Sequence, residues 1–321
     1  MIVRIRLDFA YDGSDFYGWA KQPTLRTVQG ELESALHKVL RVPEGDESEP
    51  LRLTVAGRTD TGVHAAHQVC HLDVSQSVLE NCIGHMSCDL LSALEYRLRH
   101  VLPADIAIHK VCEAPEGFDA RFSALERTYV YRIIDNSGFA FVDPRMRGFV
   151  LKIDYALDVD AMNQAAKMMV GLHDFGSFAR PNPGGTTIRE VKKAYWERIG
   201  DCGKSNTCAH ECCSSVSNNL ESDAFYRVPP LEQGLLEFTI VADAFAHNMV
   251  RSLVNASVQI GMGKRTLDWF NEKIHNPIRE GSTGPIAPHG LTLENVAYPP
   301  DDELGVRADA IRARRELSEL G

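Results

Sequence analysis

The sequence predicts an α+β protein made of two split β-α-β units, whose antiparallel sheets lie side by side. Two observations lead to this prediction. Both halves of the chain contain runs with alternating apolar residues, typical of strands, and runs with apolar residues every three to four positions, typical of helices. In both halves the order of these runs is β-α-β-β-α-β, although the halves share no evident sequence identity. Two such sheets would leave a central cleft between them, large enough for a macromolecular ligand.

The first half supplies four strands and two helices. Apolar residues in "TVQGELESALHKVL" recur at helical spacing, and the leucines of the next helical run lie on one side until Pro103 ends it. We predict strands at Val3–Ala10, Leu51–Ala56, Gln68–Val74 and Ile106–Val111, and helices at Thr27–Leu40 and Ser87–Leu102.

The second half repeats the order and adds a helix. We predict strands at Arg127–Asp135, Ile188–Ile199, Leu235–Ala242 and Leu291–Tyr298, and helices at Val159–Val170, Ala246–Ile260 and Leu267–Ile274. The predicted organisation is therefore an N-terminal half, residues 1–115, and a C-terminal half, residues 116–300. A polar insertion at 201–223 interrupts the second half, and a charged tail with a frayed helix covers 301–321.

The composition is that of a soluble globular protein. Of the 321 residues 44% are apolar and 24% charged, and no apolar run is long enough to span a bilayer. The start, "MIVRIRLDFAYDG", alternates like a strand and has no apolar signal segment, so we expect a cytoplasmic protein without a membrane partner. Eight cysteines in a chain of this length fit reduced thiols better than a disulfide framework.

The net charge of −10 is concentrated in three segments. Glu44–Glu49 carries −4, Asp201–Asp223 carries −3 and Pro299–Gly321 carries −2, which leaves the remaining body close to neutral. That body can still present a basic face to a nucleic acid. The candidate residues are Arg145, Arg147, Lys152, Arg180, Arg189, Lys192 and Lys193.

The segment Cys202–Cys213, "CGKSNTCAHECC", allows two interpretations. Four cysteines and His210 could hold zinc. However, the spacing lacks paired C-x-x-C motifs, and the adjacent Cys212 and Cys213 are poorly placed to bind one ion. The segment is also rich in polar residues, which favours a surface insertion without a metal.

The loop "TVAGRTDTGVHAAHQV" centres on one carboxylate, Asp60, with Arg58 two residues before it and Gly62 two residues after it. A nearby arginine favours the charged carboxylate, which can act as a nucleophile or a base but not as a general acid. A glycosidase of the usual kind needs a second carboxylate. This loop therefore suits substitution at a sugar–base bond or attack on an electron-poor ring. The alternative is a simple turn, with the nearby histidines as ordinary core or surface residues.

Several further segments, together with this loop, carry a resemblance to a known family. "GRTDTGVHAAHQVCHLDV" resembles the signature of the tRNA pseudouridine synthase A family. Family-like motifs occur in family order over nearly all of residues 3–298. They are "YDGSDFYGW", "TVQGELESAL", "LPADIAI", "FDARFSALERTYVYRI", "GLHDFGSF", "DAFAHNMVRSLV" and "GPIAPHGLTLENVAY".

This resemblance implies an isomerase that converts uridine to pseudouridine at positions 38, 39 and 40 of the tRNA anticodon stem-loop. Asp60 matches the family's catalytic aspartate, Tyr129 the tyrosine that stacks on the target base, and Arg251 the arginine that pairs with the carboxylate. The cleft would bind RNA, with Arg58, Arg121, Arg127 and His64 as further contacts. The resemblance also implies a homodimer that shares one tRNA, and neither a cofactor nor a metal.

The chain departs from the family pattern at Ala20, Asp119, Ala246 and Asn248. Asp119, which replaces a histidine, would place negative charge near the RNA path. The sequence leaves two other functions open. The same fold could act as a tRNA-folding chaperone with little turnover, or the cysteine segment could organise a zinc protein.

Overall fold

The structure is a computed structural model. It describes residues 1–45, 51–137, 142–180, 185–200, 231–278 and 284–319. The strands are β1 (Ile2–Tyr11), β2 (Thr54–Val55), β3 (His64–Ser75), β4 (Ile106–Glu113), β5 (Glu126–Ile134), β6 (Leu151–Lys152), β7 (Gly171–Asp174), β8 (Ile188–Arg198), β9 (Leu236–Ala242) and β10 (Leu291–Ala297). The helices are α1 (Val28–Leu40), α2 (Gln76–Glu80), α3 (Leu90–Val101), α4 (Val159–Met169), α5 (Met249–Gly261), α6 (Leu267–His275) and α7 (Leu304–Glu319).

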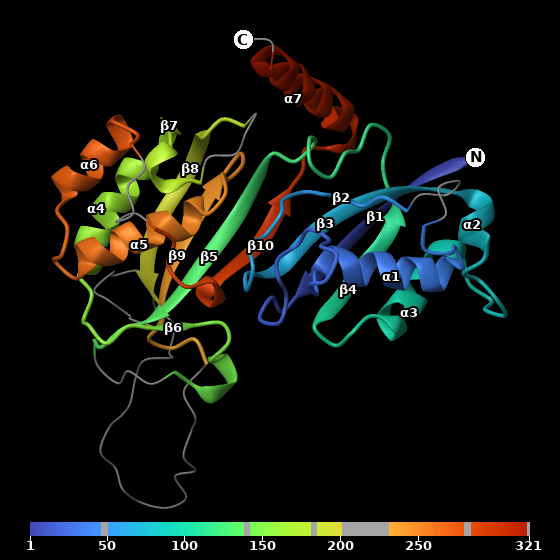
Figure 1. The fold of residues 1–321 in the computed structure, drawn as a ribbon, viewed down its shortest axis with the longest axis horizontal. Coiled ribbons are helices and arrows are strands. Elements are labelled where there is room, and N and C mark those ends of the chain that lie inside the picture. The colour runs from blue at the N-terminus through green and yellow to red at the C-terminus, as the bar shows by residue number, and fades with distance from the viewer. Residues whose placement is uncertain (46–50, 138–141, 181–184, 201–230, 279–283, 320–321) are drawn as a thin grey trace, which may run out of the picture.

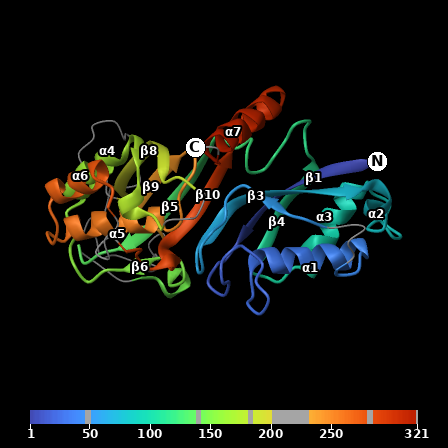
Figure 2. The ribbon, with the colours of Figure 1, turned by 45° about the horizontal axis from the view of Figure 1, so that its top comes forward.

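The strands form one ten-stranded sheet, in the order β4-β1-β3-β10-β5-β9-β8-β7, with β2 paired to β3 and β6 to β5. Helices α1, α2 and α3 gather at one end of the molecule and α4, α5 and α6 at the other, with β3, β10 and β5 between the two groups (Figure 1). The tilted view of Figure 2 keeps the same separation, and α7 extends from the edge of the molecule.

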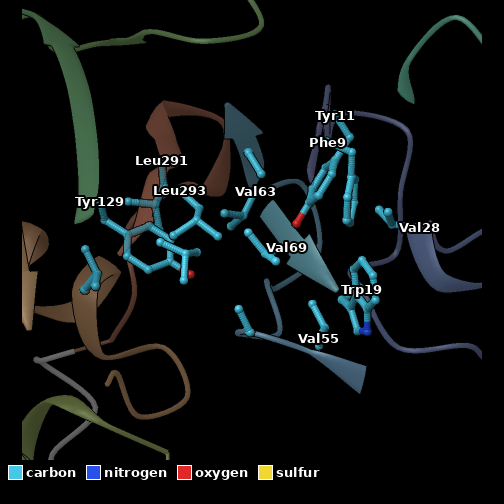
Figure 3. Packing of buried hydrophobic residues seen from close by; sticks show 14 of the residues in the cluster. Phe9, Tyr11, Trp19, Val28, Val55, Val63, Val69, Tyr129, Leu291 and Leu293 are labelled. Carbon is cyan, nitrogen blue, oxygen red and sulfur yellow. The ribbon is translucent and has the colours of Figure 1, made fainter. Parts of the chain in front are cut away.

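The predicted α+β class is confirmed, but the two predicted sheets are one. β3 of the first half pairs in parallel with β10 of the second, through Thr292 opposite His64 and Leu293 opposite Ala65. One hydrophobic core cluster also includes residues from both halves. Figure 3 shows it from Tyr129, Leu291 and Leu293 across Val63 and Val69 to Trp19 and Val28. Residues on the two sides of this join can therefore form a single site.

Side-chain caps explain where most of the predicted helices begin. Thr27 Oγ1 accepts a hydrogen bond from Gly30 N (3.2 Å) at the start of α1. Asp89 and Asp158 cap α3 and α4 in the same way. α3 begins at Leu90, three residues after the predicted Ser87. α5 begins at Met249, three residues after the predicted Ala246, and follows a left-handed Asn248 in place of a side-chain cap.

Two predicted strands have other bounds in the structure, and two strands were missed. β2 contains only Thr54 and Val55, and β3 begins at His64, four residues before the predicted start. β6 and β7, together with the short helix α2, were not predicted.

None of the described helices combines the length and the apolar character that crossing a bilayer requires. The cysteine segment 202–213 lies outside the described residues, so neither interpretation of it is tested.

A network of polar side chains links strands of the two halves of the chain near the place where β3 pairs with β10. Asp8 accepts hydrogen bonds from Arg6 (2.8 and 2.7 Å), and His67 Nε2 lies 2.8 Å from Asp8 Oδ1. The other ring nitrogen of His67 lies 2.7 Å from Asn295 Oδ1 on β10. The hydrogen bond to Asp8 raises the pKa of His67. The network therefore links β1, β3 and β10 most strongly when His67 is protonated.

Candidate active site

The loop that carries Asp60 connects β2 to β3 and is held by the backbone around it. Val63 N donates to Asp60 O (3.2 Å), which closes a turn, and Trp19 N donates to Thr59 O (3.1 Å). Gly62 has a φ of +74°, and a Cβ there would lie 2.8 Å from Pro288 Cγ. Only glycine suits this position, because it has both the left-handed backbone and the space.

Buried polar side chains contact the Asp60 loop from inside the protein. Tyr11 Oη lies 2.7 Å from Thr59 Oγ1, and Gln68 Nε2 donates to Gly57 O at 2.8 Å. Burial raises the pKa of Tyr11 to about 12, so its hydroxyl keeps its proton. The residues on either side of Asp60 are thus fixed, while its own side chain is directed away from the core and is 27% exposed.

Two cationic or potentially cationic side chains contact the Asp60 carboxylate from α5 and the loop before it. Arg251 Nη1 lies 3.7 Å from Oδ2, and His247 Nε2 lies 3.4 Å from Oδ1. The side chain of Arg251 is 14% exposed and that of His247 is 45% exposed. One carboxylate oxygen therefore faces a largely buried guanidinium, and the other faces an imidazole open to solvent.

Arg251 is fixed by the loop that precedes β10. Its Nε donates to Ile286 O (2.7 Å), and Ile286 N donates back to Arg251 O (3.2 Å). Burial lowers the pKa of Arg251, and the charge of Asp60 opposes this shift. At neutral pH the guanidinium still carries its charge, so it supplies a fixed positive charge beside Asp60.

Tyr129 lies on β5 and is 7% exposed. Its ring meets Phe245 edge-on, with centroids 5.1 Å apart. Burial raises the pKa of Tyr129, and the nearby charge of Asp60 acts in the same direction. The structure thus brings Asp60, Arg251 and Tyr129 into one neighbourhood, although they come from three distant parts of the sequence.

Arg58 and Arg121 are exposed, as RNA contacts require. Arg127 is not: it is 7% exposed, and its guanidinium donates to the backbone oxygens of Asp243 (2.6 Å), Ala56 (2.7 Å) and Arg121 (2.9 Å). These three bonds occupy the guanidinium of Arg127 and argue against the predicted RNA contact. They indicate a structural role, in which Arg127 joins the loops that lead to Asp60 and to α5.

His64 also differs from its predicted role. It is 1% exposed, its Nδ1 accepts from Gly13 N (3.0 Å), and its Nε2 lies 3.1 Å from His289 O. The ring packs on Phe149, with centroids 4.3 Å apart. Burial lowers the pKa of His64 despite the nearby Asp12. A neutral, enclosed imidazole of this kind cannot reach RNA, so His64 joins loops of the protein instead.

The other departures and basic residues have local explanations. Asp119 is 6% exposed, and its Oδ1 accepts from Arg121 N and Phe122 N, both at 2.9 Å. Its charge therefore supports a turn and does not project into solvent, contrary to the expectation of negative charge near RNA. Ion pairs of 2.7 to 2.9 Å also join three of the basic candidates to acids: Arg145 to Asp143, Lys152 to Asp154 and Lys192 to Glu126.

Sequence reasoning missed His247. Its contact with Asp60 depends on the turn at Asn248, which no spacing rule reveals, and its only local signal is its position four residues before Arg251. Among the described residues, no group of three or more His, Cys, Asp or Glu side chains could hold a metal ion.

Comparison with known proteins decides the family. A family model described as tRNA pseudouridine synthase matches residues 165–299. A tRNA pseudouridine synthase A of Bifidobacterium longum strain DJO10A is 62% identical over 316 residues, which covers 98% of this chain and 100% of the relative. The chain belongs to the tRNA pseudouridine synthase A family. The proteins of that name from Bifidobacterium animalis subsp. lactis and Streptomyces griseus are 57% and 43% identical, each over at least 96% of both chains.

This membership makes the chain an enzyme, a tRNA pseudouridine synthase. The matched span of the family model contains Arg251 but neither Asp60 nor Tyr129. The full-length relatives cover all three residues, and the geometry brings all three together.

Proposed function

We propose that this synthase isomerises uridine to pseudouridine at positions 38, 39 and 40 of the tRNA anticodon stem-loop, with Asp60 as the catalytic nucleophile. The observation that carries the proposal is the contact of one part-exposed carboxylate with Arg251. A carboxylate beside a fixed guanidinium is stabilised in its charged form. It can attack C1′ or C6 of the uridine, and removal of the C2′ proton is open to the same group.

The neighbouring residues suit the steps that such a reaction needs. The uracil must detach, rotate and rejoin the ribose through C5, and no atoms are gained or lost overall, so no cofactor is required. Tyr129 offers a flat ring on which a detached base can turn, which a hydrogen-bonded clamp would hinder. Arg251 orients Asp60 and offsets its charge.

RNA binding would supply the free energy that is needed to flip the target uridine out of its stack. Flipping a nucleotide out of its stack costs a few kcal/mol, and contacts from exposed arginines to phosphates offset that cost. We place the RNA over β3, β10 and β5, between the two helix groups, where Arg58 and Arg121 are exposed. In this arrangement the two halves, which form a pseudo-repeat, lie on opposite sides of one RNA-binding cleft.

The proposal has two further parts. From the family resemblance we propose a homodimer in which one tRNA contacts both subunits. We also propose a cytoplasmic location, because the tRNA substrate is found there. Native mass spectrometry of the purified protein tests the first part. A monomeric mass at working concentration would contradict it.

The test of the function is to map pseudouridines in tRNA from cells that lack this protein. We expect positions 38, 39 and 40 to lose the modification, the parent gene to restore it and Asp60→Ala not to restore it. Restoration by the variant would refute the role of Asp60. If the variant restored tRNA folding and cell growth without pseudouridine, the chaperone function would be favoured instead.

A further inference from the structure

His247 is a second neighbour of the Asp60 carboxylate, beside Arg251. Its Nε2 lies 3.4 Å from Asp60 Oδ1, and its side chain is 45% exposed, compared with 27% for Asp60. The imidazole is therefore the more exposed of the two groups, and a nucleotide that reached Asp60 would also come close to His247.

The backbone around His247 is fixed in an uncommon conformation. Asn248 has a φ of 63°, which side chains other than glycine seldom adopt. His247 O accepts from Arg180 N (2.9 Å), and Met249 N donates to Ala246 O (3.0 Å). A continuous helix from Ala246 would direct position 247 differently. The left-handed Asn248 instead makes the helix begin at Met249 and leaves His247 on a turn that faces Asp60.

The chemistry needs an acceptor for the C5 proton of the uracil. When C5 of uracil bonds to C1′, C5 becomes tetrahedral and still carries its hydrogen. The C5–H bond must then break, and its electron pair re-forms the C5=C6 double bond. The electron pair of the N1=C6 bond moves to N1, which takes a proton from water. This electron flow applies when Asp60 attacks C1′. If Asp60 attacks C6, the C5–H electron pair forms the C5=C6 double bond while the C6–O bond to Asp60 breaks, so C5 loses its proton on either route.

Other groups in the site are poor acceptors. The guanidinium of Arg251 keeps its protons, and burial raises the pKa of Tyr129, so its phenol is already protonated at neutral pH. Asp60 has just left C1′, or is still bonded to C6, when C5 loses its proton, and it must be an unprotonated carboxylate again for the next attack. An imidazole can take a proton near neutral pH, and an exposed one can pass it to water.

We propose that His247 accepts the C5 proton of the target uridine and releases it to solvent. This inference rests on the proposed function, because it assumes a uridine bound at Asp60. Neutral His247 takes the proton on Nε2, becomes imidazolium beside the regenerated Asp60 carboxylate, and returns to the neutral form by proton transfer to water.

The test is single-turnover conversion of tRNA that carries ordinary or 5-deuterated uridine, with and without imidazole in the buffer. We expect His247→Ala to slow conversion by about 10²-fold or more, to show a severalfold deuterium effect larger than that of the parent, and to be partly rescued by imidazole. The control His275→Ala, an exposed histidine on α6, should show none of these changes.

The possible outcomes are distinguishable. A slow His247→Ala enzyme without an increased deuterium effect and without imidazole rescue would overturn the inference and make His247 a residue that only positions Asp60. An unchanged rate would also overturn it. Both results leave the proposed function intact if Asp60→Asn is inactive, whereas an active Asp60→Asn enzyme would refute the function itself.

Discussion

Arg127 gives the sharpest test of how the loops around the site are held. Its buried guanidinium donates to three backbone oxygens, at 2.6, 2.7 and 2.9 Å. Charge-assisted hydrogen bonds contribute about 1.5–3 kcal/mol each. Burial lowers the pKa of Arg127, which reflects the desolvation of its charge, and that cost is several kcal/mol. We therefore expect Arg127→Met to lower the free energy of unfolding by a net amount of about 3 kcal/mol.

The assay is urea unfolding followed by tryptophan fluorescence. Trp19 is a suitable reporter, because it is 2% exposed and its backbone bonds to the Asp60 loop. The matched control is Arg58→Gln at an exposed position, for which we expect weaker tRNA binding and a change in unfolding free energy within about 0.5 kcal/mol. If Arg127→Met weakened tRNA binding while the unfolding free energy fell by less than about 1 kcal/mol, the structural role would be refuted. The result would instead support the RNA contact predicted from the sequence.

Three other predictions concern charge, backbone shape and pH. Arg251→Gln should lower the single-turnover rate by about 10²-fold with little change in tRNA affinity, and an equal loss of affinity would contradict its role beside Asp60. Gly62→Ala should lower the unfolding free energy by about 1–2 kcal/mol, whereas Gly57→Ala, whose added Cβ meets no atom within 4 Å, should not. His67 has a raised pKa in the folded protein, so its contribution is complete below its unfolded pKa and is lost as pH rises through the folded value. His67→Asn should therefore destabilise the protein more near pH 5.5 than near pH 8.5, and a constant difference would contradict this.

The sequence indicated the Asp60 turn because that information is local. A single acid and a glycine with a positive φ lie two residues apart, and the structure places both in the turn from Asp60 to Val63. The arginine that contacts the carboxylate is Arg251, whereas the sequence pointed to the neighbouring Arg58. Arg251 could be connected to Asp60 only through the family resemblance, since almost two hundred residues separate them. The sheet join was missed for a similar reason, because it depends on two residue pairs between distant strands.

Burial was the property that the sequence conveyed least well. Arg127, Tyr129 and Tyr131 alternate along β5, and all three are buried. This period of two was available from the sequence and could have placed Arg127 inside, but its charge favoured the RNA interpretation. His247 was beyond any such rule, because its direction depends on the left-handed Asn248.

The central claim is that one carboxylate, oriented by a guanidinium, performs the isomerisation. The most direct measurement is tritium release from tRNA labelled at C5 of uridine, in a single turnover with saturating enzyme, for the parent and Asp60→Asn. This variant keeps the shape of the side chain, so tRNA affinity and unfolding free energy should be close to those of the parent. We expect its release to fall by at least about 10³-fold. Release within about tenfold of the parent rate would contradict the account.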